Sequence, residues 1–235
     1  MEHQIDIIKQ KVIELLSQDK TGHGVDHIDR VLTLALKFAQ QEQADINLVT
    51  IIALLHDADD YKLFGHKAST SLPNAQRIMQ EAGLDLATQD QICTEIQHLG
   101  YSKRLQNIKP QTLEGQIVSD ADMCDGLGVH GILRTYQYGI AHHRPFFQKE
   151  NSPNTNYNPE DYAISNASET SVDHFFEKLL HLKDLMLTPS GKHEAETRHN
   201  FTVDFLRQLF QEENATEWLE YLDNYLTKNG GTDRN

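Results

Sequence analysis

Five consecutive apolar residues, Ile51 to Leu55, run directly into His56 and Asp57. The segment from about Leu48 onward is apolar almost all round, and a helix of that kind has to be buried. The fold must therefore enclose this segment and place the His-Asp pair at its C-terminal end. Burying both polar side chains is costly unless something compensates, and a bound cation would do so.

A second candidate ligand stands at the start of another expected helix, over about 25–41. Helical spacing puts His23, Asp26, His27 and Arg30 on one side near its first turns. Arg30 follows His27 by one helical turn. We therefore expect Arg30 either to hold a substrate phosphate or to form a salt bridge with Asp26.

A third helix, expected over about 111–123, ends in a group of acidic residues. Asp120 and Asp122 point about 200° apart on a helix of 3.6 residues per turn, so only one can face the two histidines. We expect Asp122 to be that residue. Asp120 is then a candidate for a place behind the ligands or for a general base, and Asp125 is expected on a solvated acidic face.

Two imidazoles and two carboxylates could meet in this way, from His27, His56, Asp57 and Asp122. That mixture suits one divalent cation with water in its remaining positions. Mn²⁺ and Mg²⁺ are favoured, while Fe²⁺, Co²⁺ and Ni²⁺ also fit. A second metal would need His66 and His98, which we expect instead at the surface or behind the ligands.

Apolar residues recur at helical spacing along the chain, and no segment alternates strictly as a strand would. The sequence therefore predicts an all-α fold. We expect a metal-binding helical core over residues 1–135, a C-terminal helical subdomain over 136–228 packed on it, and a disordered tail over 229–235. The GxGxxG match at Gly126 to Gly131 follows an acidic helix rather than a strand, so dinucleotide binding is not expected.

The net charge of −14 argues against a nucleic-acid polymer as partner, because phosphate backbones reward basic surfaces. A small nucleotide remains compatible, since a metal and a few cations can neutralise its phosphates. The two cysteines form no CxxC pattern, which fits a reducing compartment. No signal peptide and no apolar run of membrane-spanning length is visible. We expect a cytoplasmic protein without membrane contact, and a homodimer stays open.

The order His, His-Asp, Asp on an all-α chain resembles the HD-domain superfamily of metal-dependent phosphohydrolases. His27, His56, Asp57 and Asp122 occupy the four positions of its signature. The likeness is closest to a small bacterial branch similar to nucleotide pyrophosphohydrolases, and it extends over about residues 20–210. The chain departs from that branch after Asp122, where Met-Cys stands in place of the more usual Arg-Leu.

The resemblance implies a metal-dependent hydrolase of small nucleotides, most simply a (deoxy)nucleoside triphosphate pyrophosphohydrolase. The alternatives are a phosphomonoesterase or phosphodiesterase of nucleotides, or a nucleotide-binding regulator without catalysis. In the hydrolase, Asp120 or Asp60 would accept the proton of the attacking water. Positive side chains would hold the phosphates, and the candidates are Lys62, Arg30, Arg134 and Lys178.

Overall fold

The computed structural model describes residues 1–17, 24–153 and 169–229, without the side chains of Lys62 and Asn229. These residues form helices and no strand, so the all-α prediction is confirmed. The chain divides into two compact units, residues 1–126 with 182–195 and residues 127–181 with 196–235. The first unit thus ends at Gly126 rather than at residue 135, and it regains a segment from late in the chain.

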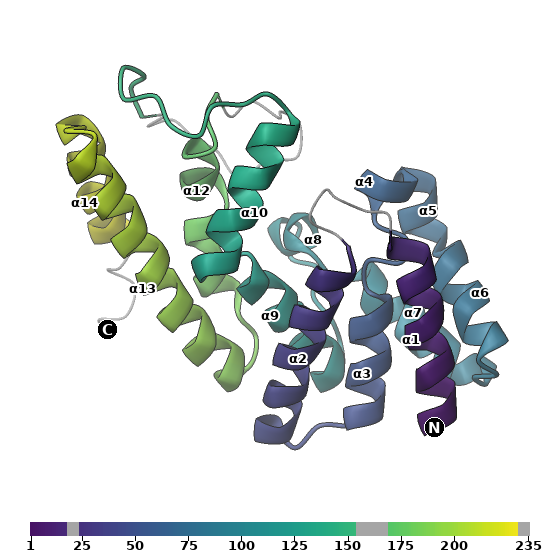
Figure 1. The fold of residues 1–235 in the computed structure, drawn as a ribbon. Coiled ribbons are helices and arrows are strands. Elements are labelled where there is room, and N and C mark those ends of the chain that lie inside the picture. The colour runs from purple at the N-terminus through teal and green to yellow at the C-terminus, as the bar shows by residue number, and fades with distance from the viewer. Residues whose placement is uncertain (18–23, 154–168, 230–235) are drawn as a thin grey trace. The chain divides into compact units, whose positions relative to one another are not determined.

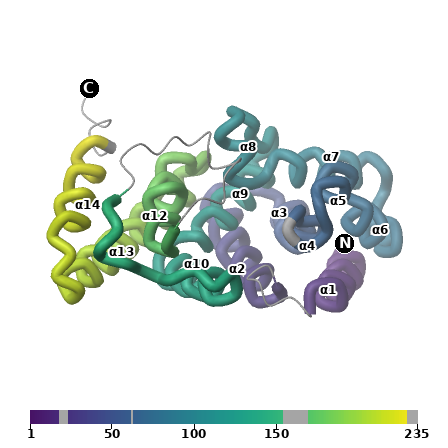
Figure 2. Tube along the Cα trace, turned by 90° about the horizontal axis from the view of Figure 1, so that it is seen from above, coloured from purple at the N-terminus to yellow at the C-terminus, as the bar shows by residue number. Residues whose placement is uncertain are grey.

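The first unit is built from helices that lie early in the sequence (Figure 1). They are α1 (Glu2–Leu16), α2 (Val25–Glu42), α3 (Ile46–Leu55), α4 (Tyr61–Phe64), α5 (His66–Ser71), α6 (Pro73–Glu81), α7 (Leu86–Gln97), α8 (Tyr101–Leu105) and α9 (Leu113–Asp125). Helix α3 is central, because α1, α2, α7 and α9 all contact it, and Figure 2 shows it among them from above. The residues from Ile51 to Leu55 are at most 1% exposed, as their composition predicts.

The elements from Gly128 onward are α10 (Gly128–Ala141), α12 (Asp173–Glu177), a 3₁₀ helix (Leu179–Leu185), α13 (Pro189–Glu212) and α14 (Thr216–Asn229). The second unit has an aromatic core around Trp218, whose ring contacts those of Phe147, Phe176 and Phe210. Asn229 closes α14, and the rest of the tail expected over 229–235 lies outside the described residues. No described helix is long and apolar enough to cross a membrane.

The connection between α2 and α3 is only three residues long and reverses the chain. Gln43 ends α2 in a left-handed conformation, with φ 58°, and its backbone N–H donates to the Ala39 carbonyl. The Asp45 carboxylate then accepts hydrogen bonds from the backbone N–H groups of Asn47 and Leu48 and caps α3. As a result, the start of α2 and the end of α3 lie at the same end of the unit.

Candidate metal centre

His27 enters the site from the first turn of α2. The apolar face of that helix, with Ile28 and Val31, is buried in the core, and the His27 side chain is buried with it at 1% exposure. His27 Nδ1 donates to Asp125 Oδ2 at 2.7 Å. A carboxylate acceptor at this distance assigns the ring proton to Nδ1, so Nε2 is left with its lone pair.

His56 caps the C-terminus of α3, where the buried helix meets the site. Its Nδ1 donates to the Ala53 carbonyl at 2.8 Å. A carbonyl oxygen can only accept, so the proton of a neutral His56 also sits on Nδ1. Its Nε2 then carries a lone pair that can bind a metal. Asp57 follows in the turn after α3, and its side chain is 13% exposed.

The two Nε2 atoms point at each other, 3.2 Å apart. With a lone pair on each, this contact is repulsive unless a cation or a proton lies between or beside the two atoms. Asp57 Oδ2 lies 3.4 Å from the Nε2 atom of His27 and 3.6 Å from that of His56. Asp122 Oδ1 lies 3.4 and 3.9 Å from the same two nitrogen atoms.

These distances fit one cation. Donors that each lie about 2.1 Å from a common ion are separated by about 3 to 4 Å. Two imidazoles and two carboxylates form a donor set for a divalent metal of intermediate hardness. His27, His56 and Asp57 alone already bring one ligand atom each within 4.8 Å of one another. The side chains expected to hold a metal therefore do converge.

Asp122 lies on α9, and its side chain is 27% exposed. Desolvation raises the pKa of its carboxyl group, but the hydrogen bond with His27 and the charges of His56 and His27, which apply when these rings carry a second proton, outweigh that effect, so the pKa is lowered. A carboxylate with a lowered pKa suits a cation site, because a metal binds the ionised form. Of the two aspartates that helical geometry left open, this is the one that meets the histidines.

The side chain of Asp120 contacts Leu187 and Thr188. Its carboxylate is completely buried and accepts hydrogen bonds from the backbone N–H of Leu187, the backbone N–H of Thr188 and the Thr188 hydroxyl. These bonds tie α9 to the segment just before α13. A carboxylate used in this way is a structural anchor, which speaks against the expected role as general base.

Arg30 forms a salt bridge with Asp125, which neither of the two expectations for this residue included. Its Nε donates to Asp125 Oδ1 at 2.7 Å and its Nη2 donates to Oδ2 at 3.0 Å. This hydrogen bonding raises the pKa of Arg30. The expected salt bridge to Asp26 is replaced by this pair, and the guanidinium is turned toward Asp125 rather than presented for a phosphate.

Asp125 is the residue that sequence reasoning misplaced. Expected on a solvated face, it is 2% exposed and contacts both His27 and Arg30. The available signal was a matching spacing: Asp125 follows Asp122 by three residues on α9, and Arg30 follows His27 by three residues on α2. When two helices pack together, such pairs can meet one turn along.

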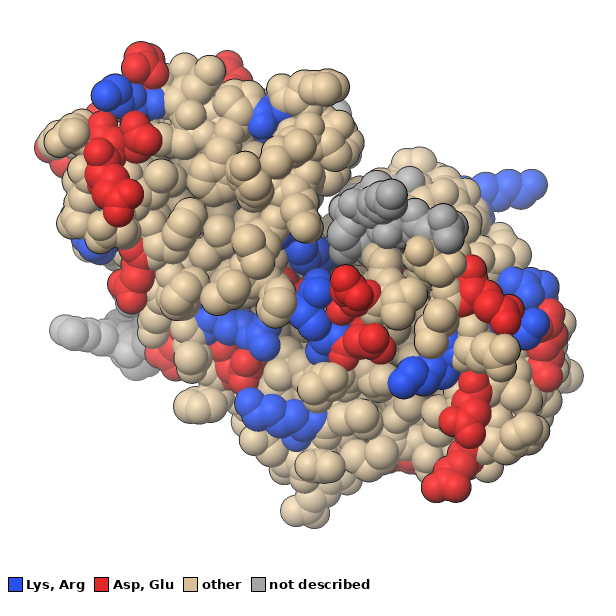
Figure 3. All heavy atoms as spheres, viewed as in Figure 1, with Lys and Arg blue, Asp and Glu red and all other residues tan. Residues whose placement is uncertain are grey.

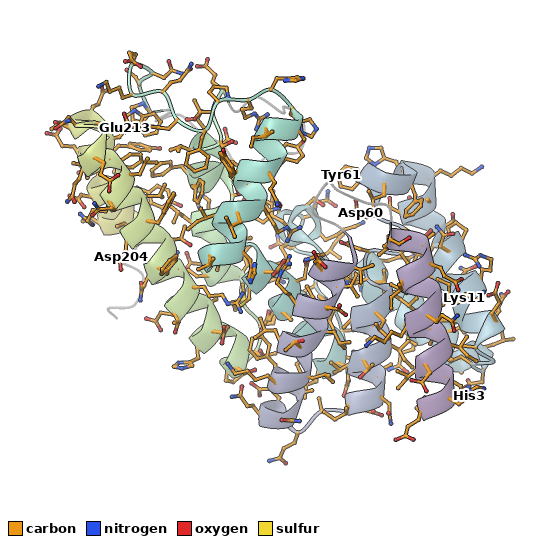
Figure 4. The ribbon with its side chains drawn as sticks, viewed as in Figure 1. His3, Lys11, Asp60, Tyr61, Asp204 and Glu213 are labelled. Atoms are coloured by element: carbon orange, nitrogen blue, oxygen red, sulfur yellow. The ribbon has the colours of Figure 1, made fainter. Side chains whose placement is uncertain are left out.

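Asp60 stands in the turn between α3 and α4 and is partly buried. Figure 4 shows it beside Tyr61, at the end of the first unit where α4 begins. Lys62 is the second residue of α4, while Arg134 and Lys178 belong to the second unit. Their roles stay predictions. Neither His66, exposed at the start of α5, nor His98, at the end of α7, joins a group of three ligands in the described part of the chain.

Comparison with known proteins gives a consistent picture. The HD domain family matches residues 24–127, a range that contains all four candidate ligands. The Bacillus subtilis protein YpgQ is 32% identical over 208 residues, which cover 88% of this chain and 92% of YpgQ. A solved structure of YpgQ in complex with ADP has a TM-score of 0.67 and covers 89% of this chain and 94% of that one, at 28% identity.

Two further solved structures are similar over almost their whole length. A protein from Lactobacillus plantarum has a TM-score of 0.77 at 31% identity, covering 92% of this chain and 99% of its own. An HD-superfamily hydrolase from Bacillus thuringiensis has a TM-score of 0.66 at 30% identity, with coverages of 91% and 98%. The similarity therefore extends over both units and is not confined to the residues around the ligands.

Proposed function

Because this chain belongs to the HD-domain family and is a metal-dependent phosphohydrolase, we propose that it hydrolyses a phosphoanhydride bond of a small nucleotide. The substrate that we propose is a nucleoside or deoxynucleoside triphosphate, cleaved to the monophosphate and pyrophosphate. The observation that carries this proposal is that two imidazole Nε2 atoms lie 3.2 Å apart and that each of two carboxylates lies within 3.9 Å of both of them.

A divalent metal held by His27, His56, Asp57 and Asp122 would polarise a phosphoryl oxygen and lower the pKa of a bound water. The four side chains supply four donors, which leaves room for water and substrate in a six-coordinate sphere. We propose Mn²⁺ or Mg²⁺ as that metal, because half of the donors are carboxylate oxygens.

The other candidate residues have roles that follow from their chemistry. Asp60, partly buried one turn beyond the ligands, is the remaining candidate to accept a proton from water, now that Asp120 is occupied. Lys62, Arg134 and Lys178 are proposed to neutralise phosphate oxygens. Arg30 is no longer proposed to touch phosphate, since Asp125 binds two of its nitrogens.

Two observations support a small nucleotide rather than a nucleic acid. YpgQ, with 32% identity, has been solved with ADP bound. This chain also carries a net charge of −14, and Figure 3 shows acidic and basic side chains interspersed on the viewed face of the first unit. A strongly acidic protein favours a ligand whose few charges are neutralised locally. A cytoplasmic location and a homodimer remain proposals.

The test is a panel of nucleotides incubated with the Mn²⁺-loaded protein. Ribo- and deoxyribonucleoside triphosphates, monophosphates and cyclic nucleotides are separated by chromatography, and pyrophosphate and orthophosphate are assayed independently. We expect triphosphates to yield monophosphate and pyrophosphate. His56→Ala should abolish turnover, whereas His3→Ala, which removes an exposed histidine of α1 (Figure 4), should not.

The products distinguish the alternatives. Orthophosphate from monophosphates, or opening of cyclic nucleotides, would identify a phosphomonoesterase or a phosphodiesterase instead. If the metal-loaded protein binds nucleotides tightly but leaves every one of them intact, it is a regulator, and the proposed reaction is wrong.

A further inference from the structure

The buried carboxylate of Asp125 links the candidate metal centre to Arg30, a positively charged side chain that the proposed reaction does not use. Asp125 shares its two oxygens between His27 Nδ1, at 2.7 Å, and Arg30, whose Nε and Nη2 donate at 2.7 and 3.0 Å. Both the His27 and Asp125 side chains are nearly inaccessible, at 1% and 2% exposure. All three residues lie in the first unit, on the packed helices α2 and α9.

The imidazole of His27 can bind a metal through Nε2 only while its proton stays on Nδ1. The carboxylate of Asp125 holds that proton and also sets the plane of the ring. When Nδ1–H donates to a carboxylate rather than to a neutral acceptor, the opposite nitrogen, Nε2, becomes more basic and binds a metal more strongly. His56 has only such a neutral acceptor, the Ala53 carbonyl, so the two imidazoles are held in unlike ways.

Arg30 in turn fixes Asp125. Two parallel N–H groups of a guanidinium bind a carboxylate in a planar geometry that permits little rotation. Burying a carboxylate next to a neutral imidazole would be costly without an opposite charge, and Arg30 provides that charge from a position at which its own side chain is 27% exposed.

We propose that Asp125 is a positioning residue of the metal centre. Arg30 fixes the Asp125 carboxylate, and the carboxylate in turn fixes the tautomer and the ring orientation of His27 before a metal binds. The proposal rests on the metal site of the proposed function but not on the nature of its substrate. Asp125 does not reach the metal itself. It acts through Nδ1 of His27, on the side of the ring opposite the ion.

The test measures metal affinity and not hydrolysis. Mn²⁺ is titrated calorimetrically into the wild-type protein and into Asp125→Asn, Asp125→Glu and Arg30→Met variants, and circular dichroism confirms that each is folded without metal. We expect Asp125→Asn to weaken Mn²⁺ binding about 10- to 100-fold, as for other partners of metal-bound histidines. Asp29→Asn, which removes one negative charge from the exposed face of α2, should bind as the wild type does.

The Arg30→Met variant separates positioning from simple charge. If Asp125 and Arg30 influenced the metal only through space, removing a positive charge would strengthen Mn²⁺ binding. Positioning predicts the opposite, because Asp125 is then free to rotate away from His27. Asp125→Glu keeps the charge but displaces the carboxylate, so it too should bind Mn²⁺ more weakly.

Three results would overturn the proposal: wild-type Mn²⁺ affinity in Asp125→Asn, wild-type affinity in Asp125→Glu, or unchanged or tighter binding in Arg30→Met. Should Asp125→Asn fail to fold, Arg30→Met and Asp125→Glu still decide the matter. None of these results would affect the proposed hydrolase, which stands or falls on the products that the wild-type protein releases. A wild-type protein that hydrolyses triphosphates while Asp125→Asn keeps full affinity would separate the two.

Discussion

At the scale of single residues, two aspartates two positions apart on α9 serve different purposes. Asp122 lies with the histidines, while Asp120 accepts hydrogen bonds from Leu187 and Thr188. Helical geometry requires that they diverge, and the apolar residues before them indicated which one turns toward the histidines. The anchoring of Asp120 could not be predicted, because its partners lie 67 and 68 residues later in the sequence.

Asp120→Asn tests this difference. An amide places an NH₂ group where a carboxylate oxygen accepts hydrogen bonds, so one buried donor loses its partner. Such a loss costs about 1 to 3 kcal/mol, and more when the lost partner is charged. We expect a lower free energy of unfolding in urea and unchanged Mn²⁺ affinity. A normal stability together with a loss of turnover in the folded protein would restore Asp120 as the general base.

The sequence predicted four side chains that the fold brings together, but not the residues that support them. His27, His56, Asp57 and Asp122 could be selected because their side-chain types and order are rare among apolar helices. Asp125 could not, since an acidic residue at a helix end is usually solvated. Its burial depends on Arg30 arriving from α2, 95 residues earlier in the chain, and a contact of that kind is set by packing.

At the scale of elements, helix existence was easier to predict than helix ends. The helix expected over about 25–41 is α2, Val25–Glu42. The one expected from about Leu48 begins at Ile46, because Asp45 caps it. A single residue, Leu72, with φ 50°, separates α5 from α6, and Pro73 begins the second helix.

Asp45→Ala should destabilise α3 at its capped end. Two backbone N–H groups lose their acceptor, which costs about 1 kcal/mol. The neighbouring Asn47→Ala is the matched control, since Asn47 contributes only its backbone N–H and should change stability by less than about 0.5 kcal/mol. Urea unfolding followed by circular dichroism measures both. Equal effects in the two variants would contradict the assignment of the cap.

Gly191 on α13 lies against Asp120 of α9. A Cβ atom added there would collide with the carboxylate of Asp120. We therefore expect Gly191→Ala to lower the free energy of unfolding by about 1 to 3 kcal/mol, although alanine favours helices. Gly83→Ala is not a suitable control, because Gly83 has φ +73°. Ser190→Ala, one residue away, is the better comparison. A stabilised Gly191→Ala protein would show that the two helices can separate at little cost.

At the scale of the whole molecule, the four candidate ligands come from α2, from the end of α3 and the turn after it, and from α9, which meet only in the folded chain. A metal that binds only the folded first unit adds about 2.7 kcal/mol of stability at 100 times its dissociation constant. For a chain of this size, that corresponds to roughly 5 to 10 °C in melting temperature. We expect Mn²⁺ to raise the melting temperature of the wild type but not that of Asp57→Asn, and EDTA to reverse the rise.

Two probes can locate this stabilisation. The single tryptophan, Trp218, lies in the second unit, whereas circular dichroism follows the helices of both. If the units unfold independently, Mn²⁺ should shift the dichroism transition while tryptophan fluorescence changes little. A shift in fluorescence alone would place the stabilising ion in the second unit, away from the four ligands.

The tight reversal at Gln43 to Asp45 gives α2 and α3 one joined end and one open end, and His27 and His56 stand at the open one. A bound ion would therefore connect the start of α2 to the end of α3, at the ends of the helix pair farthest from the reversal. Amide hydrogens near residues 25–28 and 53–57 should exchange with deuterium faster once the metal is removed, while those beside the reversal should keep their rates. The same exchange experiment would show how far from the ligands that loosening extends into α3.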